Sequence, residues 1–215
     1  MYKYVADFIS AAKYSLKCPY TMSPQFIVVH NTANDAGAVN EIAFMKNSDA
    51  QTSFHFAIDD AEVRQGLPLN RNAWHAGDGE NGRGNRRGIA VEICYSASGG
   101  EKFKKAEENA AKYIASLLKE YGWGIDRVKK HQDFSGKYCP HRTLDMGWER
   151  FLKLIDKYMS EDIKTEELTQ INDIVWELSS KGIITNKDLW LSKLELDEEA
   201  YWLARKTANY IREKN

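Results

Sequence analysis

A short segment of the chain combines an imidazole and a thiol at a spacing that suits a metal ion. The segment runs from residue 131 to 141 and reads HQDFSGKYCPH, so His131 and Cys139 flank a turn at Ser135-Gly136. Imidazole nitrogen and thiolate sulfur are donors that zinc prefers. A Ser-Gly turn lets the backbone fold back, which brings both donors to one ion. Two protein ligands do not hold a catalytic zinc ion, so a third is expected elsewhere.

The best candidate for the third ligand is His30. It ends the apolar run PQFIVVH and is followed by the polar pair Asn31 and Thr32. A histidine at the end of a buried strand, facing a His-turn-Cys loop, gives three ligands and one open position, which is typical of catalytic zinc. Two alternatives remain at this stage. His30 can be a hydrogen-bonded structural residue, and His141 can compete as a ligand, although we rank it below His30.

Hydrolysis at such a site also needs a proton carrier and a group that stabilises the oxyanion. Glu92 lies in the otherwise apolar run GIAVEICY, where an ionised side chain is costly unless it has a partner. We predict Glu92 as the proton carrier and Lys137, close to the thiol in sequence, as the oxyanion stabiliser. The alternatives are an ion pair of Glu92 with Arg86 or Arg87, and a solvated loop position for Lys137.

The remaining histidines and cysteines are weaker candidates. His75 and Trp74 share the AWHAG loop, and His55 lies on an expected strand; we take these three as substrate contacts. His55 can instead be a satisfied core residue, and the Trp74-His75 pair an ordinary surface feature. Cys18 and Cys94 are expected to be small buried hydrophobic residues.

The hydrophobic pattern predicts the elements that position these groups. Apolar and alternating runs predict strands at 26–30, 53–60, 62–69, 88–95 and 128–131, with a hairpin at 59–61. Helical spacing predicts helices within 1–20, at 39–45, at 101–121 and at 146–159. The glycine-rich stretch 70–88 is a long loop, and such loops are often functional. The expected fold class is α/β, with a central mixed β-sheet flanked by helices.

Strand 88–95 has two distinct faces. Ile89, Val91 and Ile93 fall on one face, and Ala90, Glu92 and Cys94 on the other.

The composition changes after residue 160. Residues 161–215 carry 8 Lys/Arg against 12 Asp/Glu, while residues 1–160 carry 22 against 19. The last segment predicts three helices, one over about 165–180, one opening at Thr185 with Asp188 in a capping-box spacing, and one from about Asp197. We therefore expect a catalytic domain at 1–160 and a small all-α module at 161–215.

The overall composition is that of a soluble globular protein and argues against several other classes. A hydrophobic content of 43% and a charged content of 28% are those of a soluble globular chain. The formal net charge of −1 argues against a nucleic-acid partner, and no apolar run has transmembrane length. Three cysteines give no disulfide framework. The first residues suit an amphipathic helix better than a signal peptide. We expect a chain made in the cytoplasm, without a signal peptide and without a membrane partner.

Five segments in order carry a family resemblance: the strand ending in His30-Asn31-Thr32, then SFHFAIDD, AWHAGDG, GIAVEICY and HQDFSGKYCPHR. Together they resemble the zinc-dependent N-acetylmuramoyl-L-alanine amidases of phage endolysins, which are related in fold to peptidoglycan recognition proteins. The resemblance covers about residues 15–158. It implies one zinc ion held by His30, His131 and Cys139, with Glu92 and Lys137 as catalytic residues. The implied reaction cleaves the amide between the lactyl group of N-acetylmuramic acid and L-Ala in bacterial peptidoglycan.

Two other functions compete with a phage or prophage endolysin that acts on the wall after release. One is a non-catalytic peptidoglycan-binding protein on the same fold, and the other is a cytosolic amidase that recycles wall fragments. Cys139 favours an enzyme, because relatives that only recognise peptidoglycan typically lack this ligand. The extra module 161–215 favours an endolysin and suggests cell-wall targeting. The sequence leaves the oligomeric state open.

Overall fold

The structure is a computed structural model that describes residues 2–214. The chain divides into two compact units, Met1–Met159 and Ser160–Asn215. The first unit contains all the predicted site residues.

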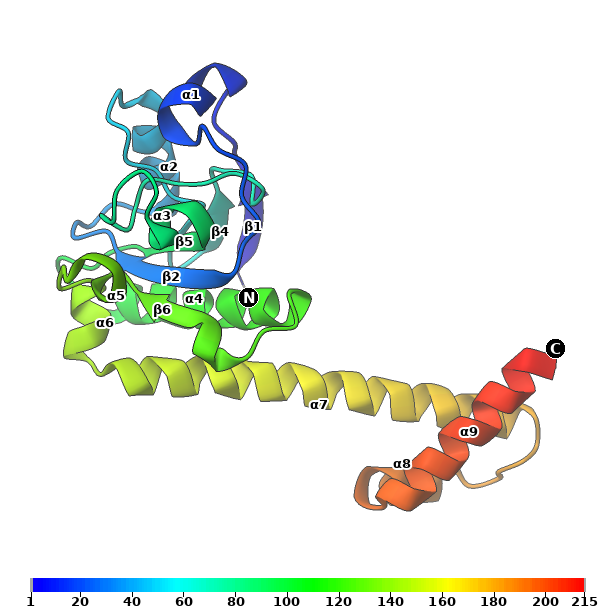
Figure 1. Ribbon diagram of the computed structural model, residues 1–215. Coiled ribbons are helices and arrows are strands. Elements are labelled where there is room, and N and C mark those ends of the chain that lie inside the picture. Colours follow the sequence, from blue (N-terminus) through cyan, green and yellow to red (C-terminus); the bar gives the residue numbers. More distant parts are fainter. Residues whose placement is uncertain (1, 215) are drawn as a thin grey trace. The chain divides into compact units, whose positions relative to one another are not determined.

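A six-stranded sheet forms the centre of the first unit (Figure 1). Its strands are β1 (Lys3–Ala6), β2 (Phe26–Asn31), β3 (Phe56–Ile58), β4 (Glu62–Gln65), β5 (Gly88–Ile93) and β6 (Val128–Lys130). Their order is β1-β4-β3-β5-β2-β6. The β3–β4 hairpin is antiparallel and every other pair is parallel, so the predicted mixed sheet is confirmed. The central strands β2 and β5 are nearly continuous apolar runs, as expected for strands buried on both faces.

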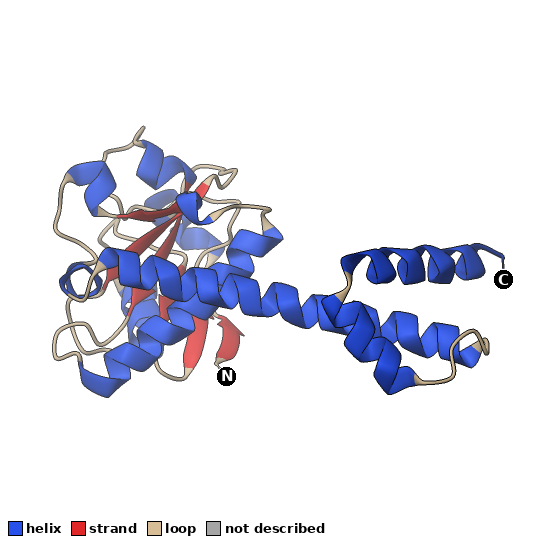
Figure 2. Ribbon diagram, turned by 90° about the horizontal axis from the view of Figure 1, so that it is seen from below, coloured by secondary structure: helices blue, strands red, loops and turns tan. Residues whose placement is uncertain are grey.

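Helices cover both faces of this sheet, as Figure 2 shows from below. The long ones are α2 (Ala38–Asn47), α4 (Gly100–Glu120) and the first turns of α7 (Trp148–Ser180). Shorter segments are the 3₁₀ turns Ala11–Lys13 and Ile125–Arg127 and the helices α1 (Tyr14–Lys17), α3 (Arg83–Arg87), α5 (Gln132–Ser135) and α6 (His141–Asp145).

The predicted alternation of strand 88–95 is confirmed. Ile89, Val91 and Ile93 pack in one buried cluster with residues of α4 and α7. Ala90 and Cys94 pack in a second cluster with α2 on the opposite face. Because successive side chains point to opposite faces, Glu92 lies on the α2 side of the sheet. This places the site on one face and the larger core on the other.

Three local predictions are wrong. The amphipathic pattern near the N-terminus does not form one helix, because residues 3–6 pair in parallel with β4 as an edge strand. The helices expected at 146–159 and 165–180 are one continuous helix, α7. The cap of α8 (Lys187–Leu196) is Asn186 rather than Thr185, since the Asn186 side chain accepts the N–H of Leu189.

The second unit is helical, with α8 and α9 (Glu198–Lys214) beside the end of α7. Of the five α7 positions expected to be buried, Ile171, Ile174, Val175 and Leu178 lie in its buried cluster, and the side chain of Leu168 lies outside the described residues. Within the described residues, no helix combines the length and apolarity that crossing a bilayer requires.

Candidate active site

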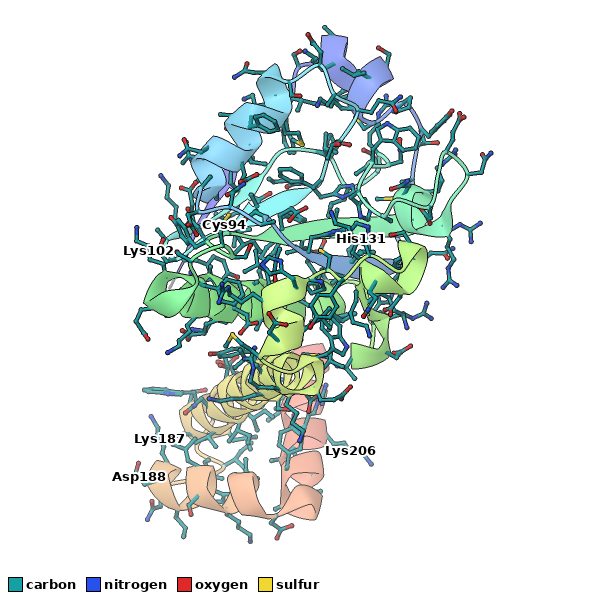
Figure 3. All side chains as sticks on the ribbon, turned by 90° about the vertical axis from the view of Figure 1, so that its left-hand side faces the viewer. Cys94, Lys102, His131, Lys187, Asp188 and Lys206 are labelled. Atoms are coloured by element: carbon teal, nitrogen blue, oxygen red, sulfur yellow. The ribbon has the colours of Figure 1, made fainter. Side chains whose placement is uncertain are left out.

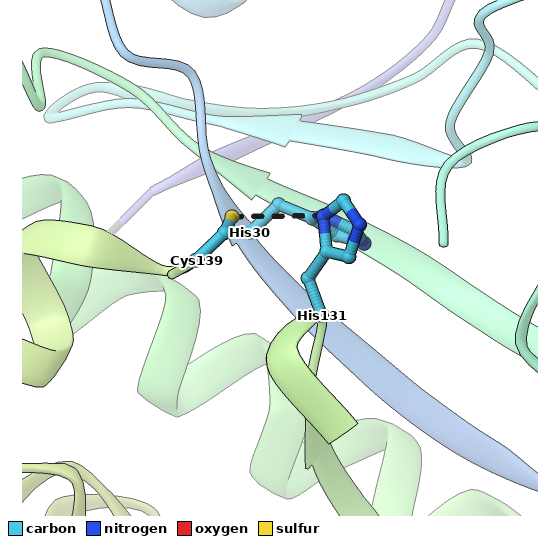
Figure 4. Close-up of side chains that lie close together, drawn as sticks. All are labelled: His30, His131 and Cys139. Atoms are coloured by element: carbon cyan, nitrogen blue, oxygen red, sulfur yellow. Dashed lines mark hydrogen bonds between the residues drawn. The ribbon is translucent and has the colours of Figure 1, made fainter. Parts of the chain in front are cut away.

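Three potential metal donors converge at the carboxyl end of β2. The donor atoms of His30, His131 and Cys139 lie within 4.8 Å of one another, and all three side chains are buried (Figure 4). The two Nδ1 atoms are 3.1 Å apart, and Cys139 Sγ is 4.0 Å from His30 Nδ1. Zinc–ligand bond lengths at a tetrahedral angle give roughly 3.3 Å between two nitrogens and 3.6 Å between nitrogen and sulfur. The spacing of the three donors is therefore compatible with a metal site.

The sheet brings these donors together. His131 follows β6 directly, β6 pairs with β2, and the His131 N–H donates to Val29 O at 3.3 Å. The loop then closes because the Gln132 N–H donates to Cys139 O at 3.0 Å. Gly136 ends α5 in the left-handed region with φ 76°, which a glycine adopts without strain. The predicted turn thus returns the chain to the metal donors.

His141, the alternative ligand, lies outside the cluster. Its Nε2 is 3.2 Å from Ser96 O, at hydrogen-bond distance. The group of possible metal donors found among the described residues is His30, His131 and Cys139.

Asn31 is a structural contributor that the sequence did not reveal. Its Oδ1 accepts the backbone N–H groups of Arg142 and Thr143 at 2.9 and 3.2 Å. These bonds connect the end of β2 to the start of α6, just after Cys139. The only signal in the sequence was a polar residue directly after His30.

The electrostatics of the metal-free site keep the donors neutral. Burial, with the neighbouring His75 and His131, holds the pKa of His30 well below its usual range, and burial also lowers the pKa of His131. Burial raises the pKa of the Cys139 thiol to about 11, with a further contribution from Glu92. Neutral imidazole is the form that binds metal, whereas the thiol must lose its proton. A divalent cation supplies the positive charge that favours the thiolate.

His75 lies directly behind one of the donors. Its Nδ1 is 2.9 Å from His30 Nε2, the ring nitrogen that faces away from the other two donors. Its backbone is held by Asn85, whose Oδ1 accepts the N–H groups of His75 and Ala76 at 2.8 Å. A partner on the outer nitrogen of a metal-binding histidine fixes its tautomer and ring orientation. His75 was expected to contact the substrate, and it does line the site cavity. Its hydrogen-bond distance to His30 also gives it a second position, as a support for that donor.

Glu92 lies beside His30 on the neighbouring strand. The parallel register of β2 and β5 pairs the two residues. Glu92 Oε2 is buried and has no hydrogen-bond partner within the described residues. Burial raises the Glu92 pKa to about 8, Glu41 adds to the rise, and Lys137 opposes it. The alternative ion pair is not observed, since Arg87 donates to Gln25 and Arg86 stacks on Tyr20.

A cavity of about 970 Å³ opens over these groups. The three donors, Glu92 and the exposed Lys137 line one part of it, and Tyr20, Thr52 and Trp74 line another. The Trp74 indole N–H donates to Leu16 O at 3.1 Å, and its ring meets Tyr20 edge-on. The part of the lining formed by Trp74 and Tyr20 is therefore a fixed aromatic surface.

His55 does not line this cavity. Its Nε2 donates to Arg71 O and its Nδ1 accepts the Ala90 N–H, both at 2.9 Å, and its side chain is fully buried. Both ring nitrogens are occupied by backbone groups, so His55 is a structural residue rather than the expected substrate contact. Cys18 and Cys94 are buried as expected.

The fold and the site together bring buried potential metal donors, a desolvated carboxyl group and an exposed lysine around one cavity. Comparison with known families agrees. Residues 20–142 match the family model described as N-acetylmuramoyl-L-alanine amidase. The chain belongs to this family, and the predicted resemblance is confirmed.

Two curated relatives are N-acetylmuramoyl-L-alanine amidases of Bacillus subtilis. The chain is 59% identical to the amidase XlyB of Bacillus subtilis (strain 168) over 75% of its own length and 51% of that protein. It is 63% identical to the amidase CwlA of the same strain, over 67% of this chain and 53% of that protein. It thus spans about half the length of these relatives.

Solved structures agree with the fold. PlyL superposes with a TM-score of 0.69 at 49% identity, covering 71% of this chain and 96% of PlyL. The PlyG catalytic domain superposes with a TM-score of 0.70 at 48% identity, and the match covers 73% of this chain and 95% of that domain.

Proposed function

We propose that this chain hydrolyses the amide bond between the lactyl group of N-acetylmuramic acid and L-Ala in bacterial peptidoglycan, using one zinc ion held by His30, His131 and Cys139. The observation that carries the proposal is the buried three-donor cluster beside Glu92, whose Oε2 lacks a partner among the described residues. The family match and the relatives named as amidases support it.

Zinc supplies Lewis-acid activation of water and of the scissile carbonyl. The protein residues have separate tasks. Glu92 accepts the proton of the attacking water and transfers it to the leaving nitrogen, for which a raised pKa is suitable. Lys137 presents a positive charge to the oxygen that becomes negative in the transition state. Trp74 and Tyr20, which line the same cavity, hold the sugar-peptide substrate through apolar contact.

An intact donor set separates this proposal from a non-catalytic peptidoglycan binder. A protein that only binds does not need Cys139 within reach of His30 or a buried carboxyl group beside it. The geometry therefore favours turnover.

For the second unit we propose cell-wall targeting. Trp176 is 63% exposed, and the Lys187 ammonium lies 3.3 Å from its ring centroid. Exposed aromatic rings stack on sugar rings, so Trp176 is the residue to test first. Trp190 and Tyr201 pack partly against the helical core. The side chain of Trp202 lies outside the described residues.

The test of the reaction is mass spectrometry of products from purified walls. Amide cleavage releases peptides with a free N-terminal L-Ala and leaves glycan chains of unchanged length. New reducing sugar ends, or cleavage within the peptide, would contradict the proposal.

A further inference from the structure

A second cavity, of about 570 Å³, lies near the start of β2 and β5. Three arginines line it, Arg83, Arg86 and Arg87, together with the polar side chains of Thr21, Ser23 and Gln25. No Asp or Glu is among its lining residues. Three guanidinium groups around one hollow, without a lining carboxylate, form a site for a negatively charged group.

Neighbouring side chains hold these guanidinium groups in place. The Arg86 Cζ atom lies 3.9 Å from the centre of the Tyr20 ring, and that of Arg83 lies 5.0 Å from the centre of the Phe26 ring. Arg87 donates to Gln25 Oε1 at 3.2 Å. A guanidinium stacked on an aromatic ring keeps its in-plane N–H groups available for an oxyanion. The arginines are thus partly ordered before any ligand arrives.

Two acidic side chains of the neighbouring loop have partners of their own. The Glu80 carboxylate accepts the Tyr20 hydroxyl. The Asp78 carboxylate accepts the N–H groups of Gly84 and Asn85 at 2.6 and 3.2 Å. Residues 1–160 as a whole carry 22 Lys/Arg against 19 Asp/Glu. The positive charge of the cavity is therefore not cancelled within its walls.

The arginine cavity lies next to the catalytic one. Tyr20 and Glu80 line the catalytic cavity, and the next residues in the chain, Thr21 and Asn81, line the arginine cavity. A polymer that occupies the first cavity can extend into the second. We propose that the arginine cavity binds an oxyanion, a phosphodiester or a carboxylate, carried by the same wall polymer whose amide is cleaved. The identity of that polymer rests on the proposed function.

The test measures binding by the full-length protein, so it does not depend on hydrolysis. Isothermal titration at low salt uses two soluble probes, poly(glycerol phosphate) for phosphodiesters and poly-L-glutamate for carboxylates. The variant Arg83→Gln/Arg87→Gln removes two exposed charges. We expect it to bind whichever probe the parental protein binds about tenfold more weakly than the parental protein does. Its affinity should also depend less on salt, because fewer counterions are released on binding.

The control variant Lys102→Gln/Lys104→Gln changes the net charge equally. Lys102 lies over the Tyr95 ring, just beyond the other end of β5, and Figure 3 places it well away from His131. Lys104 forms an exposed ion pair with Glu101. Circular dichroism melts verify that both variants are folded. If the arginine variant fails to fold, single substitutions Arg83→Gln and Arg87→Gln replace it.

The probe that binds identifies the source of the oxyanion. Binding of either probe that weakens in the arginine variant and not in the lysine variant supports the proposal. Failure of both probes to bind, or equal weakening in the two variants, overturns it. A protein that binds a probe through the arginines but releases no peptide from walls disproves the amidase activity and leaves the anion site standing.

Discussion

Replacing Glu92 by Gln tests two consequences of its position at once. The two side chains have nearly the same shape, so β5 and the metal donors stay in place. Glutamine cannot accept and transfer the water proton, and general acid–base catalysis is worth roughly 10²–10⁴ in rate. The expected loss is about 3–5 kcal/mol of transition-state stabilisation. The assay is release of N-terminal L-Ala from purified walls, with zinc content measured on the same samples.

The same change should stabilise the metal-free protein. The unfolded chain loses the Glu92 proton near its ordinary pKa of 4.5, whereas burial holds the folded pKa near 8, so this group lowers stability progressively as pH rises between those values. At about 1.4 kcal/mol per pH unit, the cost at pH 7 is at most about 3 kcal/mol.

Urea unfolding of both metal-free proteins at pH 5 and pH 8 measures the effect. The advantage of Glu92→Gln should be larger at pH 8. Glu101→Gln, on the exposed start of α4, is the control and should change neither rate nor stability. A variant that cleaves walls at the parental rate would show that Glu92 is not the proton carrier. Equal stability differences at the two pH values would show that its carboxyl group is not desolvated.

Four further outcomes are expected. Cys139→Ala should lose both zinc and activity; full zinc content in that variant, measured by atomic absorption, would point to another ligand. His75→Ala should weaken zinc affinity about 10–100-fold in chelator competition, because His30 loses its outer hydrogen-bond partner; unchanged affinity would reduce His75 to a packing residue. Lys137→Ala should keep zinc and reduce turnover by about 10²–10³; a parental rate would make it a solvated loop lysine. An isolated 161–215 fragment should sediment with purified walls; a helical fragment that stays in the supernatant and self-associates would indicate an oligomerisation module instead.

The central sheet and the approach of His131 to Cys139 were predictable from sequence because their signals are local, whereas the position of His30 beside them depends on the pairing of β2 with β6. The alternation of Ile89, Val91 and Ile93 with Ala90 and Glu92 fixes two faces within one short strand. The spacing from His131 to Cys139 contains its own turn at Gly136. Neither inference needs to know where distant residues lie.

The supporting contacts were not predictable, because they join segments far apart in the chain. His75 and His30 are 45 residues apart in the chain, and the hydrogen bond from the Thr143 N–H to Asn31 joins residues 112 positions apart. The strand at residues 3–6 is exposed on most positions and exists because β4 offers it backbone partners. Continuity of α7 was missed because a change in charge composition at residue 160 does not interrupt a helix.

The register between β2 and β5 limits which insertions and deletions the first unit can accept. His30 and Glu92 share a face only because each lies at the right parity along its strand. Adding one residue near the middle of β5 would turn the carboxyl group into the apolar cluster under α4 and bring an isoleucine to the cavity. Adding two would restore the face but displace the carboxyl group along the strand by about 7 Å. Length variation among functional homologues should therefore fall in the connecting loops and spare these two strands.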